Sequence, residues 1–156
     1  MSNIYFPDEE VTYNDLYFVC FMIERTARHL KQPNAYVVHH LNKRGLERQL
    51  SIAATNHCLN PDQVVADWID EYNLQSGNTD VTKVDARFAD VYPTDLQMGK
   101  VYARLVHAVA QQNDNLADTL MKVYDSEICE VLDNYNTGAY YEPSYVQTRA
   151  FWNGGF

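Results

Sequence analysis

Residues 12–30 constrain the fold more than any other part of the chain. Thr12 and Asp15 form a capping-box pattern, in which each side chain can bond a backbone N–H group of the first helical turn. The eight residues 16–23 are all apolar, and apolar residues then recur at spacings of three and four. A helix that is apolar on nearly all sides usually lies at the centre of a bundle. The segment therefore predicts a central helix. A buried strand over 16–23 is the alternative, which the cap disfavours.

Three shorter helices are predicted in the rest of the first half. Pro33 suits a first helical turn because its missing N–H group would have no helical partner there, and Gly45 suits a left-handed helix end. Asn60 and Pro61 indicate another start, as a cap and a first helical residue. The predicted helices cover residues 34–43, 46–56 and 61–74.

The second half begins with an irregular stretch and then returns to helix. Residues 76–93 contain Gly77 and Pro93, and they predict either a linker or a loop with one short helix around 82–89. A capping box at Thr94 and Gln97 indicates one helix start, and a cap at Asn113 or Asp114 indicates the next. The helix after that cap either breaks at Asp125 and Ser126 or continues to Tyr135. A last helix is predicted from Pro143 to near Trp152.

These signals predict an all-α protein, a compact bundle of about six to seven helices. The hydrophobic content of 46% and the charged fraction of 21% are ordinary for a globular protein. Two organisations fit the pattern. The chain forms either one compact domain or two helical halves, residues 1–75 and residues 94–156, joined by a linker over 76–93.

Several features are typical of a cytoplasmic protein. No apolar run approaches the about 20 residues of a membrane span, and the first ten residues lack the basic and apolar regions of a secretory signal. Cys20, Cys58 and Cys129 are odd in number and widely spaced. We therefore expect buried thiols in a reducing compartment rather than a disulfide framework.

The net charge of -9 is unevenly distributed. Residues 1–50 carry six Lys/Arg and six Asp/Glu, whereas residues 51–156 carry six against fifteen. This acidity disfavours a general nucleic-acid binder, although a local basic face could still contact phosphates. The candidate residues for that face are Arg25, Arg28, Lys43, Arg44 and Arg48.

No catalytic, cofactor-binding or metal-binding residue is predicted. The spaced ligand pairs of a zinc site do not occur, because the sequence has neither Cys-x-x-Cys nor His-x-x-x-His. Gly99 and Lys100 lie within a predicted helix without a preceding glycine-rich loop, so they are not a phosphate loop. Cys58 beside His57 is the least unfavourable candidate nucleophile. An enzyme with an unrecognised site is therefore one alternative.

The C-terminal segment of residues 133–156 holds four of the twelve tyrosines and one of the two tryptophans. Such rings can strap across a bundle with their hydroxyl groups in water, and they are also enriched at interface hot spots. We expect the segment to be mostly a strap with some rings left for a protein partner. The candidate partner-binding residues are Asp133, Tyr140, Tyr141, Glu142 and Tyr145.

Four stretches also resemble a known family. They read IERTARHL, VVHHLNKRGLERQLSIAATNHCLNPDQVVADWIDEYNL, PTDLQMGKVYARLV and ICEVLDNYNTGAYYEPSYVQTRAFWNGGF. They resemble a small all-helical bacterial family of Firmicutes type and of unknown function, and they cover most of the chain. Because such domains are sometimes encoded near ADP-ribosyltransferase-like toxins, the resemblance implies a toxin-linked partner. It implies no catalytic residues.

The sequence thus favours a non-enzymatic interaction or regulatory module that offers an acidic, tyrosine-rich surface to a basic partner. That partner is expected to be a toxin or a phage-defence protein, and a homo-oligomer is a further option. A nucleic-acid-binding regulator and an enzyme are the alternatives. No cofactor is expected.

Overall fold

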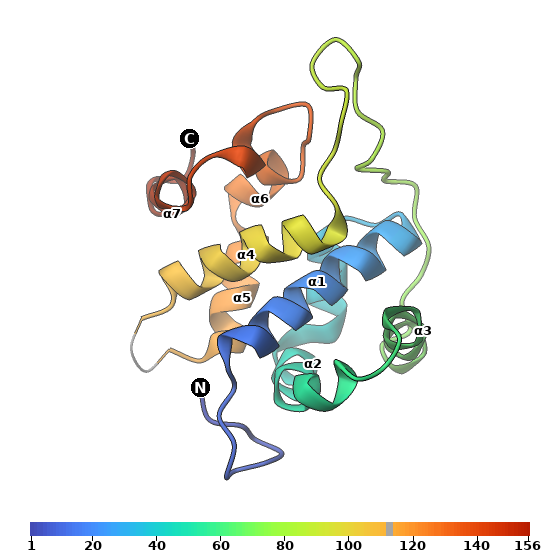
Figure 1. The fold of residues 1–156 in the computed structure, drawn as a ribbon, viewed down its shortest axis with the longest axis vertical. Helices are drawn as coiled ribbons and strands as arrows, with labels where there is room; N and C mark the ends of the chain where they lie inside the picture. Colours follow the sequence, from blue (N-terminus) through green and yellow to red (C-terminus); the bar gives the residue numbers. More distant parts are fainter. Residues whose placement is uncertain (112–113) are drawn as a thin grey trace.

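The structure is a computed structural model that describes residues 1–111 and 114–156, and it is built of α-helices (Figure 1). The described part of the chain has no β-strand beyond an isolated bridge between Ser2 and Glu10. The predicted all-α bundle of six to seven helices is confirmed. The helices within these residues are α1 (Tyr13–Leu30), α2 (Asn34–Asn56), α3 (Pro61–Glu71), α4 (Asp95–Val109), α5 (Leu116–Asp125), α6 (Glu127–Leu132) and α7 (Ser144–Asn153), with a 3-10 turn, η1 (Ala139–Tyr141), before the last.

α1 is the central helix, as predicted. Its capping box is complete, because the Asp15 N–H donates to Thr12 Oγ1 at 3.2 Å and the Thr12 N–H donates to Asp15 Oδ2 at 2.8 Å. α1 packs against α2, α3 and α4, and Val19, Met22 and Ile23 are completely buried. Figure 1 shows α1 beside α4 in the middle of the molecule, with α3 at one side and α6, η1 and α7 at the other.

Two helical segments are present as predicted, but the break between them lies at Asn42 rather than near Gly45. α2 runs from Asn34 to Asn56 with a kink at Asn42, whose φ is 57° and ψ is -175°. The Asn42 side-chain oxygen accepts the N–H groups of Arg44 and Gly45 at 3.0 and 3.3 Å, so Asn42 caps the second part of α2. Gly45 itself is helical. The Tyr72 ring packs closely against it, and a Cβ at this position would lie only 2.9 Å from Tyr72 Cε1.

Residues 76–93 form a long loop between α3 and α4, which projects from the bundle in Figure 1. No helix forms around 82–89, and α3 ends at Glu71 rather than near residue 74. The loop is attached to the end of α1, because the N–H groups of Gly77 and Thr79 donate to the carbonyl oxygens of Leu30 and Lys31 at 2.8 Å.

The later helix starts agree with the sequence in part. The Thr94 capping box opens α4, and the predicted break is present, with Ser126 as the cap between α5 and α6. α5 is capped by Asn115 rather than by Asp114. The other predicted cap, Asn113, lies outside the described residues.

The buried apolar side chains form one cluster with members from α1 to α7. The expectation of buried thiols is wrong at Cys58, which is exposed. The large apolar side chains of Leu96 and Val131 are also exposed, by 48% and 38%. Leu96 is in the first turn of α4, and Cys58 lies in the turn between α2 and α3.

Candidate functional site

A network of buried polar side chains lies between α1, α2 and the segment after α6. Glu24 of α1 is 1% exposed. Its Oε1 accepts the Tyr135 hydroxyl at 2.7 Å and Arg28 Nε at 3.1 Å, and its Oε2 accepts Asn34 Nδ2 at 2.6 Å. A buried carboxylate must be paired and hydrogen-bonded, and these three donors meet that need.

A second carboxyl group, that of Asp133, joins the network through the same amide. Asn34 Nδ2 lies 3.1 Å from Asp133 Oδ2, and the Tyr102 hydroxyl lies 2.6 Å from Asp133 Oδ1. Asp133 is half-buried as a residue, but its carboxyl group faces these donors. Burial, followed by the nearby charge of Glu24, raises the pKa of Asp133 to about 8, and hydrogen bonds from Tyr102, Cys129 and Asn34 oppose the rise.

Asp133 also borders a pocket of about 390 Å³. Pro33 and Ala35 at the start of α2 and Val81 of the loop give it apolar lining, and Cys129 lies beside Asp133. The remaining charged lining residues are Asp125 and Glu130, which are also acidic. The charged side chains that line this pocket are therefore all acidic, and none of them offers the Asp133 carboxyl group a positive charge.

A second hollow, of about 330 Å³, lies on the side of α4 toward the C-terminal segment, and we call it the aromatic groove. It is lined by residues 91–93 of the loop, Gln97 and Val101 of α4, and Tyr140 and Tyr141 of η1. Among them, Val91 is 67%, Tyr92 50% and Tyr141 85% exposed. Exposed apolar side chains gathered at one hollow are a candidate binding surface.

Residues of the buried network contact both walls of the aromatic groove, the loop wall at Pro93 and the η1 wall at Tyr140. Arg28 Nη2 donates to the carbonyl oxygen of Pro93 and to the Tyr135 hydroxyl, at 2.9 Å in each case. The Tyr135 ring packs edge-on against Tyr140, with the ring centroids 5.5 Å apart. The Arg28 guanidinium group, which Glu24 orients, thus connects the loop side of the groove with the η1 side.

The structure separates the five predicted partner-binding residues. Asp133 lies in the network rather than on an open surface, while Tyr140 and Tyr141 line the aromatic groove. Glu142 is exposed directly after them, and Tyr145 is 66% exposed on α7, beside the Arg149 guanidinium group. Sequence reasoning missed residues 91–93. The apolar run Val-Tyr-Pro immediately before a capping box was the available signal.

Most of the predicted nucleic-acid face is engaged with acidic side chains. Arg28 bonds Glu24 inside the network, and Arg44 is exposed. The surface pairs are Arg25 with Asp62 and Asp95 at 2.8 and 3.0 Å, Lys43 with Asp118 at 3.0 Å, and Arg48 with Glu71 at 2.9 Å. These pairs reduce the positive potential that a phosphate backbone would meet.

The cysteines give little support to a nucleophile. Burial raises the pKa of Cys20 to about 12 and raises that of Cys129 further, so both remain thiols at neutral pH. Cys58 is exposed, with its Sγ 3.8 Å from the carbonyl oxygen of Ala54. Residues 1–111 and 114–156 contain no group of three metal-ligand side chains, and none of their helices combines the length and the apolar character needed to cross a membrane.

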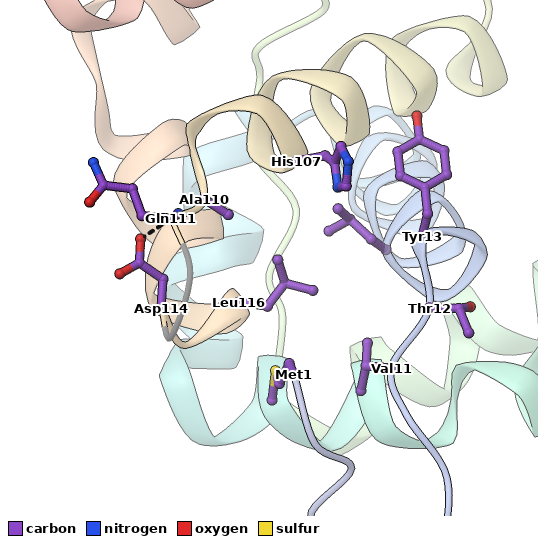
Figure 2. Close-up of a pocket in the computed structure, with 10 residues that line it drawn as sticks. Met1, Val11, Thr12, Tyr13, His107, Ala110, Gln111, Asp114 and Leu116 are labelled. Carbon is purple, nitrogen blue, oxygen red and sulfur yellow. Dashed lines mark hydrogen bonds between the residues drawn. The ribbon is translucent and has the colours of Figure 1, made fainter.

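Another pocket of about 390 Å³ lies between the N-terminal segment and the end of α4 (Figure 2). Tyr13 and His107 meet edge-on there, with ring centroids 5.4 Å apart. The hydrogen bond drawn in Figure 2 joins the Gln111 N–H to Asp114 Oδ2 at 2.8 Å. The Asp114 carboxylate therefore accepts a backbone hydrogen bond and gives no indication of a ligand.

Comparisons with protein-family models, with curated proteins and with solved structures find no match to this chain. The expected kinship with a Firmicutes-type family therefore stays a prediction, and the functional argument rests on the geometry of the groove and the network.

Proposed function

We propose that this protein is a non-enzymatic interaction module whose aromatic groove binds an extended, basic, proline-containing segment of a partner protein. The observation that carries the proposal is the uncovered aromatic lining between the 76–93 loop and η1. The sequence resemblance implies a toxin-linked partner that presents such a segment, and a phage-defence protein is the other partner class in this proposal.

The lining chemistry of the groove favours a polyproline II segment. Proline-rich segments dock in aromatic-lined grooves because they are extended before binding and lose little entropy. Their carbonyl groups accept hydrogen bonds from the receptor, because a polyproline II segment has no internal hydrogen bonds. Tyr92, Tyr140 and Tyr141 supply both ring surface and hydroxyl groups. Gln97 bonds Thr94 through its Oε1, which leaves its amide N–H groups for a ligand.

The charge distribution favours a basic segment. The whole net charge of -9 comes from residues 51–156. Asp90 and Glu142 flank the groove-lining residues in sequence, and neither makes an ion pair with any residue that the structure describes. Lys100 is the one flanking cation. Charge of this kind chiefly sets the orientation and the association rate of a basic ligand.

The proposal predicts that a fluorescent peptide of repeated Pro-Pro-Arg triplets binds this protein and that Tyr141→Ala weakens the binding about tenfold or more, as expected for an aromatic hot spot. Tyr141 is 85% exposed, so its replacement should leave the unfolding midpoint unchanged. Fluorescence anisotropy at low and moderate salt measures the affinity, and thermal unfolding checks the fold.

Tyr145→Ala is the matched control, because Tyr145 is also an exposed tyrosine but lies outside the groove. Its affinity should equal that of the parent, and a Pro-Pro-Glu peptide should bind more weakly than the Pro-Pro-Arg peptide. Equal losses in the two tyrosine variants, or no binding of the basic peptide at low salt, would contradict the proposal.

A further inference from the structure

We infer that Asp133 holds a proton in the folded protein at neutral pH, and that loss of this proton loosens residues 133–141 and the groove built on them. The titration itself stands on the buried network alone. Its effect on ligand binding rests on the proposed function of the aromatic groove.

The first argument is the count of charges in the network. Asn34 Nδ2 lies 2.6 Å from one carboxyl group, that of Glu24, and 3.1 Å from the other, that of Asp133. The guanidinium group of Arg28 bonds Glu24 and not Asp133. Two ionised carboxylates would therefore share one amide and one cation, and two like charges at one site are not both retained in a buried setting.

The second argument is the set of groups around the Asp133 carboxyl group, none of which is a cation in direct contact with it. Asn34 supplies the contact from α2 and is uncharged. The titratable and charged groups nearby are Glu24 and, through it, Arg28 from α1, Tyr102 from α4, Tyr124 and Asp125 at the pocket from α5, Cys129 and Glu130 from α6, and Tyr135.

In the structure the Tyr102 hydroxyl donates to Asp133 Oδ1, and the third argument is that this contact can reverse in the protonated form without leaving a polar atom unpaired. A proton on Asp133 Oδ1 can be donated to the Tyr102 hydroxyl oxygen at 2.6 Å, and Tyr102 can then donate its own proton to the carbonyl oxygen of Cys129 at 3.3 Å. Asp133 Oδ2 still accepts Asn34 Nδ2. Every polar atom of the neutral acid therefore has a partner, as a buried group requires.

The direction of the pH effect follows from the pKa of Asp133. Burial and Glu24 raise this pKa in the folded protein to about 8, above the value of about 3.9 for an aspartate in an unfolded chain. The proton-linked stability is therefore fully present below about pH 4 and is lost as the pH rises toward about 8. Within that window the contribution of Asp133 to the folding constant falls about tenfold per pH unit.

The link to the groove runs through Tyr135. When Asp133 ionises, its carboxylate repels Glu24, which is the acceptor of the Tyr135 hydroxyl. The Tyr135 ring supports Tyr140 edge-on, and Tyr140 lines the groove. A weaker contact between residues 133–135 and α1 thus loosens the η1 side of the groove.

The direct test is a carbon-13 titration of the aspartate carboxyl groups in the full-length protein, with the Asp133 signal assigned from backbone connections. We expect this signal to titrate far above the range of ordinary aspartates, which lies near pH 4. A signal that titrates below about pH 5 would overturn the inference, whatever the groove binds.

A variant gives an independent test. Asp133→Asn keeps the shape and the hydrogen bonds of the neutral acid, since its Nδ2 can donate to Tyr102 and its Oδ1 can accept Asn34. We expect the unfolding midpoint of the parent to fall, relative to this variant, between about pH 5 and pH 8. Glu130→Gln is the matched control, because Glu130 is an exposed carboxylate at the same pocket and should follow the parent.

The third measurement is the affinity for the Pro-Pro-Arg peptide. We expect about tenfold weaker binding to the parent at pH 9 than at pH 6, and little change for Asp133→Asn. High-pH titration without peptide binding at any pH would refute the proposed function and leave the buried proton in place. Peptide binding together with an ordinary Asp133 titration would refute the buried proton and leave the proposed function in place.

Discussion

Replacing Arg28 with alanine is expected to lower the free energy of unfolding by about 3 to 5 kcal/mol, because it leaves a buried carboxylate without its cation. Glu24 is 1% exposed, and its Oε1 would keep only the Tyr135 hydroxyl. The same substitution removes the bond to the carbonyl oxygen of Pro93. The loss should therefore affect both global stability and the loop side of the aromatic groove.

Urea unfolding followed by circular dichroism measures this effect, with Arg25→Ala as the matched control. Arg25 also makes two ion pairs from α1, with Asp62 and Asp95, but its side chain is 34% exposed. Exposed pairs contribute about 0 to 1 kcal/mol, so Arg25→Ala should cost little. The double variant Glu24→Gln with Arg28→Met should recover part of the loss, because it removes both buried charges. Equal losses for Arg25→Ala and Arg28→Ala would contradict the account of the network.

The helix starts were predictable because they depend on neighbouring residues. The capping boxes at Thr12 and Thr94 and the cap at Asn60 act within a few residues, and all three are present. The break within α2 was predicted at Gly45 instead of Asn42 for a related reason. Gly45 is the residue type best suited to a left-handed helix end, yet Asn42 takes the positive φ because its side chain caps the helix that follows.

The network and the groove could not be predicted, because each depends on contacts between distant parts of the chain. Glu24 meets Tyr135 across 111 positions, and Arg28 meets Pro93 across 65. In the sequence, Glu24 and Arg28 form an ordinary pair on one helix face, which is usually exposed to solvent. Only the structure shows that Glu24 and Arg28 are covered by Tyr135 of the segment after α6. Asp133 was selected as a surface residue for the same reason.

The close approach of α1 and α4 leads to a second large effect, at Gly99. A Cβ at Gly99 would lie 2.8 Å from both the backbone N and the Cα of Phe21. Backbone atoms cannot move aside as the end of a flexible side chain can, so the two helices would have to separate. Met98 of α4, next to Gly99, and Ile23 of α1, two residues after Phe21, are completely buried. Gly99→Ala should therefore disturb the centre of the core.

We expect Gly99→Ala to destabilise the protein by about 2 kcal/mol in total. Overpacking typically costs about 1 to 3 kcal/mol, and a backbone contact lies at the upper end of that range. The gain of about 1 kcal/mol that alanine has over glycine inside a helix offsets part of this cost. Gly138→Ala is the matched control, because a Cβ at Gly138 would meet nothing within 4 Å and the φ of -89° suits any residue. Thermal unfolding should show a lower midpoint for Gly99→Ala alone. An unchanged or raised midpoint for Gly99→Ala would mean that α1 and α4 lie farther apart than this arrangement requires.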